Sequence, residues 1–163
     1  MAMVGRISPQ KDPEFLVMVR NELVGRGDDC EFVWIGTGED EAVRELRAAG
    51  VEVTGWLSPS AVREELKRCS AYFHSASYEG FPISVLDAAA LGLPVVVREI
   101  AAFEGVAMDK ASTPSGAAEM LQALHASESA YEEAIGRSAA MLQGLRDLVP
   151  PGGLAGIYRK VAG

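Results

Sequence analysis

YFHSASYEGFPISVLDAAALGLPVVV (residues 72–97) decides the fold, because it contains a complete strand–loop–helix–strand unit. Residues 71–75 and 94–97 are short apolar runs, as expected for buried strands. Between them, Pro82 to Leu91 reads as a helix that Gly92 ends. Strands that alternate with helices of about ten residues are typical of a parallel sheet that is covered on both faces.

The same alternation extends over most of the chain. Further strands are predicted at residues 2–5, 31–36 and 51–56, and further helices at 13–26, 39–49 and 58–68. After residue 113 the pattern becomes helical, with helices expected at 114–126 and 128–148 and a short one near 154–161. The sequence therefore predicts an α/β fold: a Rossmann-like, doubly wound parallel sheet of about five or six strands with C-terminal helices. Residues 1–163 are expected to form a single domain.

Composition limits the classes of partner. The net charge of −8 argues against nucleic acid, because phosphate backbones attract basic proteins, but it leaves room for a small anionic ligand. No apolar run reaches the roughly 20 residues of a membrane span, and no signal peptide is visible. The cysteines, Cys30 and Cys69, are isolated and lack metal-ligand spacing. They are predicted to be free thiols rather than a disulfide, which is typical of a cytoplasmic protein.

The first predicted strand begins almost at residue 1, so hardly any chain precedes the sheet. Two explanations are open: a complete domain with an unusually tight start, or a segment of a longer protein. The second is the expectation here.

Ligands of open α/β sheets bind at the carboxyl ends of the strands, so the loops after the strands are the candidate sites. In the first loop, GRISPQK (5–11), Arg6 and Lys11 flank a turn that leads into a helix. Two cations beside a helix N-terminus suit a diphosphate, because the helix amides and the dipole also favour negative charge. The alternative is that both are solvated loop cations.

The second loop, IGTGEDE (35–41), resembles half of a dinucleotide-binding fingerprint. The third glycine is missing, and Asp40 and Glu41 would repel a phosphate at this helix start. Gly36 and Gly38 can form a tight turn near a nucleobase or sugar, or a turn with a purely structural role.

Two aromatic side chains also lie close to strand ends. Trp56 could stack on a base, although a position in the core or against a partner is the favoured interpretation. His74 is interpreted as a residue that supports its neighbours rather than as a ligand.

The loop after the strand at 71–75 combines a carboxylate with a helix start. Glu79 precedes this start, and proline at the first helical position leaves the amides of Ile83 and Ser84 as free donors. Asp87 projects on the same face as these two residues. The rest of the helix is apolar, so it is expected to be buried nearly all round, where a lone carboxylate is costly unless it meets a polar partner. Glu79 and Asp87 could therefore grip one elongated polar ligand. Alternatively, Glu79 pairs with a nearby cation and Asp87 caps local backbone.

Taken together and in order, VGRISPQKDPEFLVMV, FVWIGTGED and residues 51–97 resemble the C-terminal domain of retaining GT-B glycosyltransferases, the glycosyltransferase group 1 family. Matching features are a G-R-x4-K segment, a G-x-G turn, an E-G-F signature and the A-x-x-G-x-P-V-V run. The resemblance covers roughly residues 3–125.

The resemblance implies a domain that binds a nucleotide-sugar donor, UDP-sugars among them. Arg6 and Lys11 would hold the donor diphosphate, and Glu79 would be the catalytic residue that meets the hydroxyls of the transferred sugar. Asp87 takes the place of a glutamate that grips the ribose. The other implied donor-binding residues are Gly80, Phe81, Pro82, Ile83 and Ser84 near sugar and phosphate, and Gly36, Gly38, Trp56 and Leu57 near the base.

The resemblance also implies an enzyme that retains the anomeric configuration and uses no cofactor or metal. An N-terminal domain would supply the acceptor site, for a glycan, a lipid or a small molecule, so this chain alone would transfer little or nothing. The expected location is the cytoplasm, or the periphery of the inner membrane in the full enzyme. Asp87 is one methylene shorter than the family's glutamate, and REIAAFEG (98–105) keeps only Glu104 of the family's segment there. A catalytically inert binding or regulatory module and a nucleotide-sugar epimerase relative are the alternatives.

Overall fold

Six parallel strands form one sheet within residues 1–80 and 82–147, the part of the chain that the structure, a computed structural model, describes. Their order across the sheet is β3-β2-β1-β4-β5-β6, which confirms the predicted Rossmann-like architecture. The strands are β1 (Ala2–Val4), β2 (Phe32–Ile35), β3 (Val51–Val53), β4 (Tyr72–His74), β5 (Val95–Arg98) and β6 (Asp109–Ala111).

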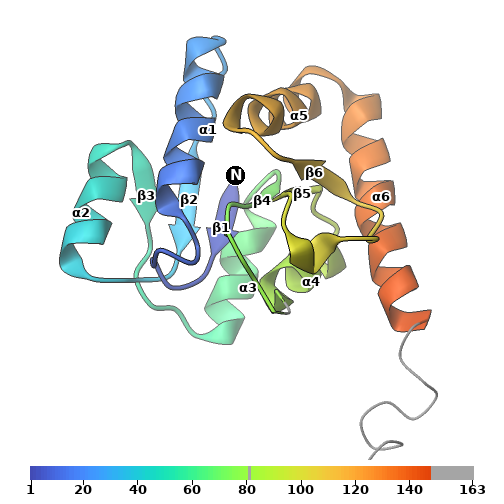
Figure 1. Cartoon of the computed structure of the whole chain (residues 1–163), viewed down its shortest axis with the longest axis horizontal. Helices are drawn as coiled ribbons and strands as arrows, with labels where there is room; N and C mark the ends of the chain where they lie inside the picture. The colour runs from blue at the N-terminus through green and yellow to red at the C-terminus, as the bar shows by residue number, and fades with distance from the viewer. Residues whose placement is uncertain (81, 148–163) are drawn as a thin grey trace, which may run out of the picture.

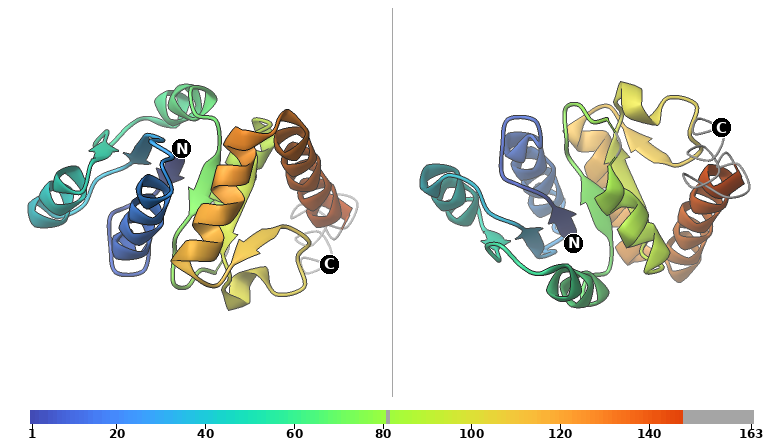
Figure 2. Two further views of the ribbon diagram at one scale, coloured as in Figure 1. Left: turned by 90° about the horizontal axis from the view of Figure 1, so that it is seen from above. Right: turned by 90° about the horizontal axis from the view of Figure 1, so that it is seen from below.

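Helices cover both faces of this sheet. They are α1 (Pro13–Gly25), α2 (Asp40–Ala48), α3 (Pro59–Lys67), α4 (Ile83–Ala90), α5 (Pro114–Ala126) and α6 (Glu128–Asp147), with a short 3-10 helix η1 (Ala101–Phe103). α1 and α5 lie side by side over one face, whereas α3 and α4 lie over the other (Figures 1 and 2). α6 packs against α4 and α5 at the β6 side of the molecule. The helix expected at 154–161 lies outside the described residues, as does the end of the helix expected at 128–148.

The start of α1 shows how local sequence signals produce these helices. Pro13 occupies the first turn, and Asp12 caps the helix by accepting a hydrogen bond from the Phe15 amide at 3.1 Å. The apolar side chains that follow form one stripe, which packs on the sheet; its buried members are Phe15, Leu16, Val19 and Leu23. The capping residue and the apolar period thus place the helix where the sequence predicted it.

The centre of the sheet is apolar on both sides. All of β2 is buried, and Trp34 lies opposite Met3 in the parallel register of β1 and β2. Tyr72 of β4 lies opposite Val95 of β5. Burial of one such large side chain contributes roughly 1.5–3 kcal/mol. These strands therefore read as continuous apolar runs, as expected of a sheet covered on both faces.

Two elements differ from the sequence-based description. β6, with the sequence DKA, had no assigned range because it carries neither an apolar run nor an alternating pattern, and the three-residue η1 had no assigned range either. β6 is an edge strand that pairs with β5, so it needs only one good neighbour and little apolar surface. No helix in the described part of the chain is long and apolar enough to cross a membrane.

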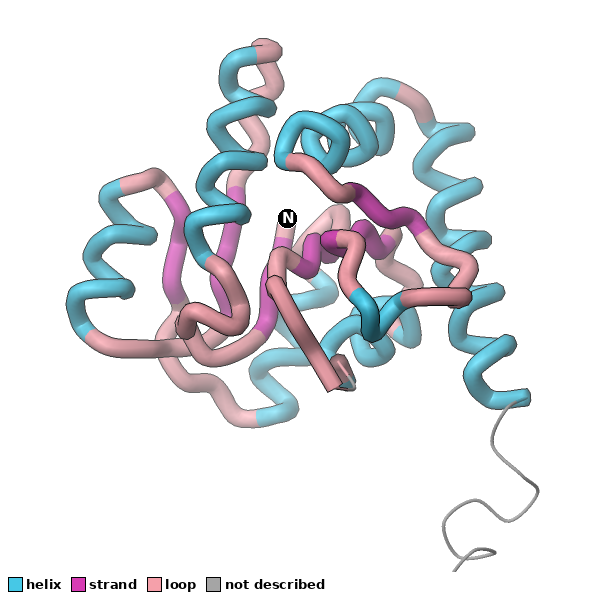
Figure 3. Tube along the Cα trace, in the orientation of Figure 1, coloured by secondary structure: helices cyan, strands magenta, loops and turns pink. Residues whose placement is uncertain are grey.

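The strand order reverses direction between β1 and β4, since the chain moves from β1 toward β3 and then returns to β4. The loops after these two strands consequently diverge to opposite faces. Crevices at such a switch point are the usual ligand sites of open α/β sheets. The loops, drawn in pink in Figure 3, gather there at the carboxyl edge of the sheet.

Candidate functional site

Hydrogen bonds join the β1–α1 loop to the β4–α4 loop at the switch point. The Gln10 carbonyl accepts from the Ser77 amide at 2.9 Å and from the Ser77 hydroxyl at 3.1 Å. The Lys11 carbonyl accepts from the Ser75 hydroxyl at 2.7 Å. The two loops therefore form one surface, although more than 60 residues of chain separate them.

An ion pair between Lys11 and Glu79 lies on this surface. The Lys11 ammonium contacts Oε1 of Glu79, and Gln10 Nε2 donates to Oε2 of the same carboxylate at 3.3 Å. Both charged side chains are largely buried, with 17% of Lys11 and 8% of Glu79 exposed. The part of the alternative in which Glu79 pairs with a nearby cation is thus confirmed, whereas capping by Asp87 stays a prediction; the cation is one of the two predicted diphosphate ligands.

A buried polar network runs from Glu79 to the start of α4. His74, which is fully buried, places Nε2 at 3.3 Å from Oε1 of Glu79 and Nδ1 at 3.2 Å from the Tyr72 hydroxyl. The Tyr72 hydroxyl donates to Oγ of Ser84 at 2.9 Å. His74 and Tyr72 therefore link the carboxylate to the first turn of the helix, consistent with the supporting role predicted for His74.

Burial keeps two members of this network, His74 and Tyr72, uncharged at neutral pH. Burial, and then the charge of Lys11, lower the pKa of His74 from 6.5 to about 3, so its imidazole is neutral at neutral pH. Burial likewise raises the pKa of the Tyr72 hydroxyl. Among the described residues, His74 Nε2 is a buried polar atom without a hydrogen-bond partner, despite its closeness to Glu79. Glu79 therefore lies beside a buried imidazole nitrogen, Nε2 of His74, that makes no hydrogen bond within the described part of the chain.

The His74 shift predicts a pH dependence of stability. Below about pH 6.5 the unfolded chain gains a proton at this histidine, whereas the folded chain gains it only near pH 3. The stabilisation from the neutral imidazole is fully present above pH 6.5 and is lost as the pH falls through this window, by about 1.4 kcal/mol per pH unit. In urea unfolding between pH 7 and pH 4, His74→Asn should show a shallower fall than the original chain. An identical pH slope in both proteins would contradict the assignment.

α4 differs from its prediction. Only one face of the helix is buried, through Val85, Ala88 and Ala89, whereas Asp87 is exposed and Ile83 is 64% exposed. The expectation of a helix buried nearly all round was wrong, because a helix that lies on a sheet needs only one apolar face and its small alanines fit either surroundings. Because the Asp87 carboxylate is exposed, it is not desolvated, and the argument from burial for a polar partner does not apply to it.

The N-terminus of α4 is open. Pro82 is the N-cap residue rather than the first helical residue, and no side chain caps this end. The first amides of a helix have no partners within it, so this end of α4 keeps donors available for an anion. Gly80 is exposed in the preceding loop, and Phe81 lies outside the described residues.

A second group of predicted residues lies across the β1–α1 loop. Arg6, Gly36, Trp56 and Leu57 line a small pocket of about 290 Å³ near the ends of β1 and β2. Trp56 is 77% exposed, so it does not lie in the core, and its contact with a partner stays a prediction. The pocket therefore combines one cation with an accessible aromatic surface.

The larger cleft lies between α1 and α2 and has a volume of about 1080 Å³. Arg6 and Gly38 line it, but Lys11, Glu79 and the residues of α4 do not. Its carboxylates, Asp12, Glu14, Glu39 and Glu45, outnumber its one cation. Despite its size, this cleft has the wrong charge for a diphosphate.

Sequence reasoning missed several residues that hold the site together. Arg98, at the end of β5, forms an ion pair with Asp12 and places its guanidinium 4.2 Å from the centre of the Phe15 ring. Gln10 and Tyr72 act through the contacts described above. The one available signal was an arginine directly after the apolar run of β5, where a side chain reaches the same edge as the loops.

The comparisons with known proteins concern the family and the fold. The sequence profile of the family described as Glycosyl transferases group 1 matches residues 1–129. The chain belongs to this family. One relative of the chain is the alpha-D-kanosaminyltransferase of Streptomyces kanamyceticus, which is 26% identical to it over 174 residues. That alignment covers 97% of the chain but 45% of the relative, so the chain spans about half of its length.

Solved glycosyltransferases share the fold of this group 1 chain. S. aureus TarM, crystallised with UDP among its ligands, superposes with a TM-score of 0.75 at 17% identity, over 86% of this chain and 31% of TarM. The catalytic domain of the Helicobacter pylori cholesterol-alpha-glucosyltransferase gives a TM-score of 0.70 at 22% identity, over 88% of this chain and 96% of that chain. The sheet and its flanking helices are thus those of a GT-B glycosyltransferase.

Proposed function

We propose that the chain is the donor-binding domain of a retaining glycosyltransferase, which transfers a sugar from a nucleoside diphosphate sugar to an acceptor. The observation that carries the proposal is the Lys11–Glu79 ion pair, which lies at the switch point next to the uncapped end of α4. It brings together a cation for the diphosphate and a carboxylate for the sugar hydroxyls. The UDP of the TarM complex supports a uridine nucleotide as the first candidate.

Donor binding would exchange the partners of this ion pair. The Lys11 ammonium leaves Glu79 and pairs with the diphosphate, which also binds Arg6 and the free amides at the start of α4. Glu79 is then released to accept hydrogen bonds from hydroxyls of the transferred sugar, which replace its buried ion pair. In the reaction, the same cations and helix end stabilise the negative charge that develops on the departing diphosphate, without a metal in the proposed step.

The nucleoside would lie toward the small pocket. Trp56 and Leu57, with the Gly36 turn, offer an accessible surface for a base there. Asp87, on the exposed face of α4, is proposed to reach the ribose hydroxyls as an aspartate in place of the family's glutamate. The acceptor site is proposed to lie in a further domain, so the chain alone should transfer little or nothing. The cytoplasm, or the inner-membrane periphery, is the proposed location.

Calorimetric titration of the chain with UDP, GDP and ADP, and in separate experiments with uridine, guanosine and adenosine, tests the proposal. At least one diphosphate should bind with a millimolar or lower Kd, and more tightly than its nucleoside, because Lys11 and Arg6 contact only the diphosphate. Absence of binding by every diphosphate at millimolar concentration would contradict the proposal. It would indicate an inert module that keeps the family's fold.

A further inference from the structure

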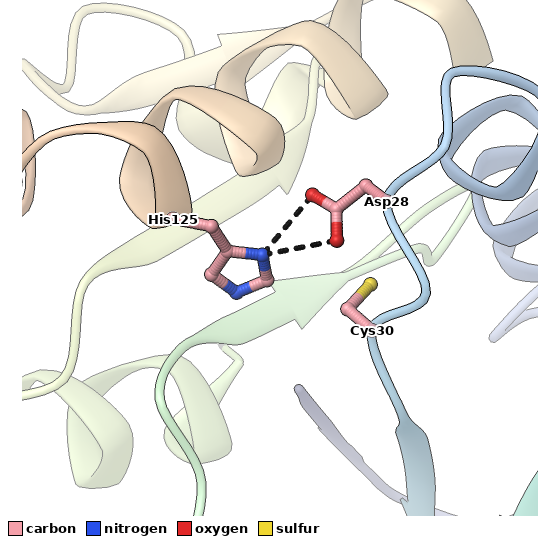
Figure 4. Close-up of side chains that lie close together, drawn as sticks. All are labelled: Asp28, Cys30 and His125. Atoms are coloured by element: carbon pink, nitrogen blue, oxygen red, sulfur yellow. Dashed lines mark hydrogen bonds and ion pairs between the residues drawn. The ribbon is translucent and has the colours of Figure 1, made fainter.

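A cluster of metal-ligating side chains lies at the opposite edge of the sheet from the donor loops. Asp28 and Cys30 belong to the segment between α1 and β2, and His125 lies in the last turn of α5 (Figure 4). Nδ1 of His125 is 3.1 and 3.3 Å from the two carboxylate oxygens of Asp28. One ligand atom from each residue lies within 4.8 Å of the other two.

We propose that Asp28, Cys30 and His125 form a binding site for a divalent transition-metal ion, with zinc as the best chemical match. Thiolate sulfur, imidazole nitrogen and carboxylate oxygen are the ligand atoms that zinc takes in proteins. In a tetrahedral zinc site such atoms are about 3.3–3.6 Å apart, as the ligand–metal distances require. The His125–Asp28 separation of 3.1–3.3 Å is already close to this spacing, whereas the Cys30 sulfur, which lies within 4.8 Å of the other two ligand atoms, would have to approach them.

The three ligands are accessible, and their own charges would balance a divalent ion. The Asp28 and His125 side chains are 14% and 30% exposed, and Cys30 is half-buried, so the ligands are partly dehydrated but reachable from solvent. A divalent ion with the Cys30 thiolate and the Asp28 carboxylate makes a neutral centre. Three protein ligands leave one tetrahedral position for water.

The thiol must lose its proton for this to occur. Burial, and then the charge of Asp28, raise the pKa of Cys30 from 9.0 to about 11. Because the thiolate and not the thiol is the zinc ligand, binding would release the thiol proton to solvent. Nδ1 of His125 hydrogen-bonds to the Asp28 carboxylate in the metal-free chain, so a metal ion held by both groups would replace the proton between them.

The bound ion would act as a cross-link. Asp28 and His125 are 97 residues apart in sequence, and the ion would tie the α1–β2 segment to the end of α5. A ligand that binds the folded chain alone stabilises it according to its concentration relative to Kd. The site shares no residue with the proposed donor site, so each proposal can fail without the other.

Cobalt(II) titration of the tag-free 163-residue chain, kept reduced with a phosphine, tests the proposal. The expected result is thiolate-to-cobalt charge-transfer absorption in the near ultraviolet with tetrahedral d–d bands, both removed by stoichiometric zinc. Cys30→Ser should abolish the charge-transfer band. Cys69→Ser should keep it, because Cys69 is also half-buried with a raised pKa but belongs to no such cluster among the described residues.

His125→Gln provides the second variant. It changes an exposed residue and leaves His74, which is fully buried, as the remaining histidine of the chain. Cobalt affinity should fall at least tenfold, and zinc should raise Tm in the original chain and in Cys69→Ser but not in Cys30→Ser. No charge-transfer band in the original chain, a band lost with Cys69 rather than Cys30, or unchanged affinity in His125→Gln would each overturn the proposal.

Discussion

Replacing Lys11 with alanine should lower the affinity of the chain for its nucleoside diphosphate by about tenfold to one-hundredfold, the range expected for hydrogen bonds to a charged group. The affinity for the matching nucleoside should change less than twofold. Lys11 supplies a largely buried positive charge at the switch point, and its loss also leaves the Glu79 carboxylate facing the diphosphate. Calorimetric titration of both ligands measures the difference directly.

Two comparisons make this prediction specific. Lys67→Ala removes the same charge from an exposed position on α3, where Lys67 pairs with Glu64 at 2.7 Å, and should leave both affinities unchanged. Glu79→Gln should maintain or raise diphosphate affinity, because glutamine neither competes for Lys11 as an anion nor repels the phosphates. Equal losses for diphosphate and nucleoside in Lys11→Ala would show that this lysine does not touch the diphosphate.

Replacing Gly36 with alanine should destabilise the fold by on the order of 3 kcal/mol or more. Gly36 has a φ of +149°, and a Cβ there would lie 2.1 Å from the carbonyl oxygen of Gly5. The loops after β1 and β2 approach each other through their backbones at this point, so neither can move away without breaking the parallel pairing. Urea unfolding at neutral pH measures the loss.

Gly55 is the matched control for this substitution. Its φ of +78° is also positive, but a Cβ there meets nothing within 4 Å, so Gly55→Ala should cost only about 1–2 kcal/mol of backbone strain. Gly38→Ala should also lower the free energy of unfolding, through steric overlap alone, because its Cβ would lie 2.7 Å from Ile7. If Gly36→Ala were no less stable than Gly55→Ala, close packing of the two loops would not explain the G-x-G turn.

The sheet was largely predictable because β1, β2, β4 and β5 lie in apolar runs, β3 alternates, and the helices carry clear start signals. Pro13 after Asp12 and Pro59 after Ser58 both begin helices where the sequence indicated them. The edge strand β6 was not predicted, because a strand that pairs with one neighbour at the edge of a sheet requires no apolar run. β1 to β4 end a residue or more before their predicted ends, because the last residues of each run turn into the loops, whereas β5 ends one residue later than predicted.

The sequence predicted which loops form the site, but not which residues contact one another there. The position of Lys11 and Glu79 after two strands placed them at one edge, yet their ion pair depends on loop paths that hydrogen bonds from Ser75 and Ser77 determine. The exposure of Asp87 could not be predicted, because the alanines around it fit a core or a surface equally well. The Asp28–His125 contact depends on how α5 packs against α1, which no local pattern encodes.

The most direct test of the central claim is a titration of the isotope-labelled chain with UDP, followed through its backbone amide signals. Donor binding at the switch point predicts progressive shifts of the Arg6, Lys11, Ile83 and Ser84 amides, with smaller effects on the Asp28–Cys30 segment. Shifts in the cleft between α1 and α2 without shifts of the Lys11, Ile83 and Ser84 amides, or no shifts at millimolar UDP, GDP or ADP, would contradict the account.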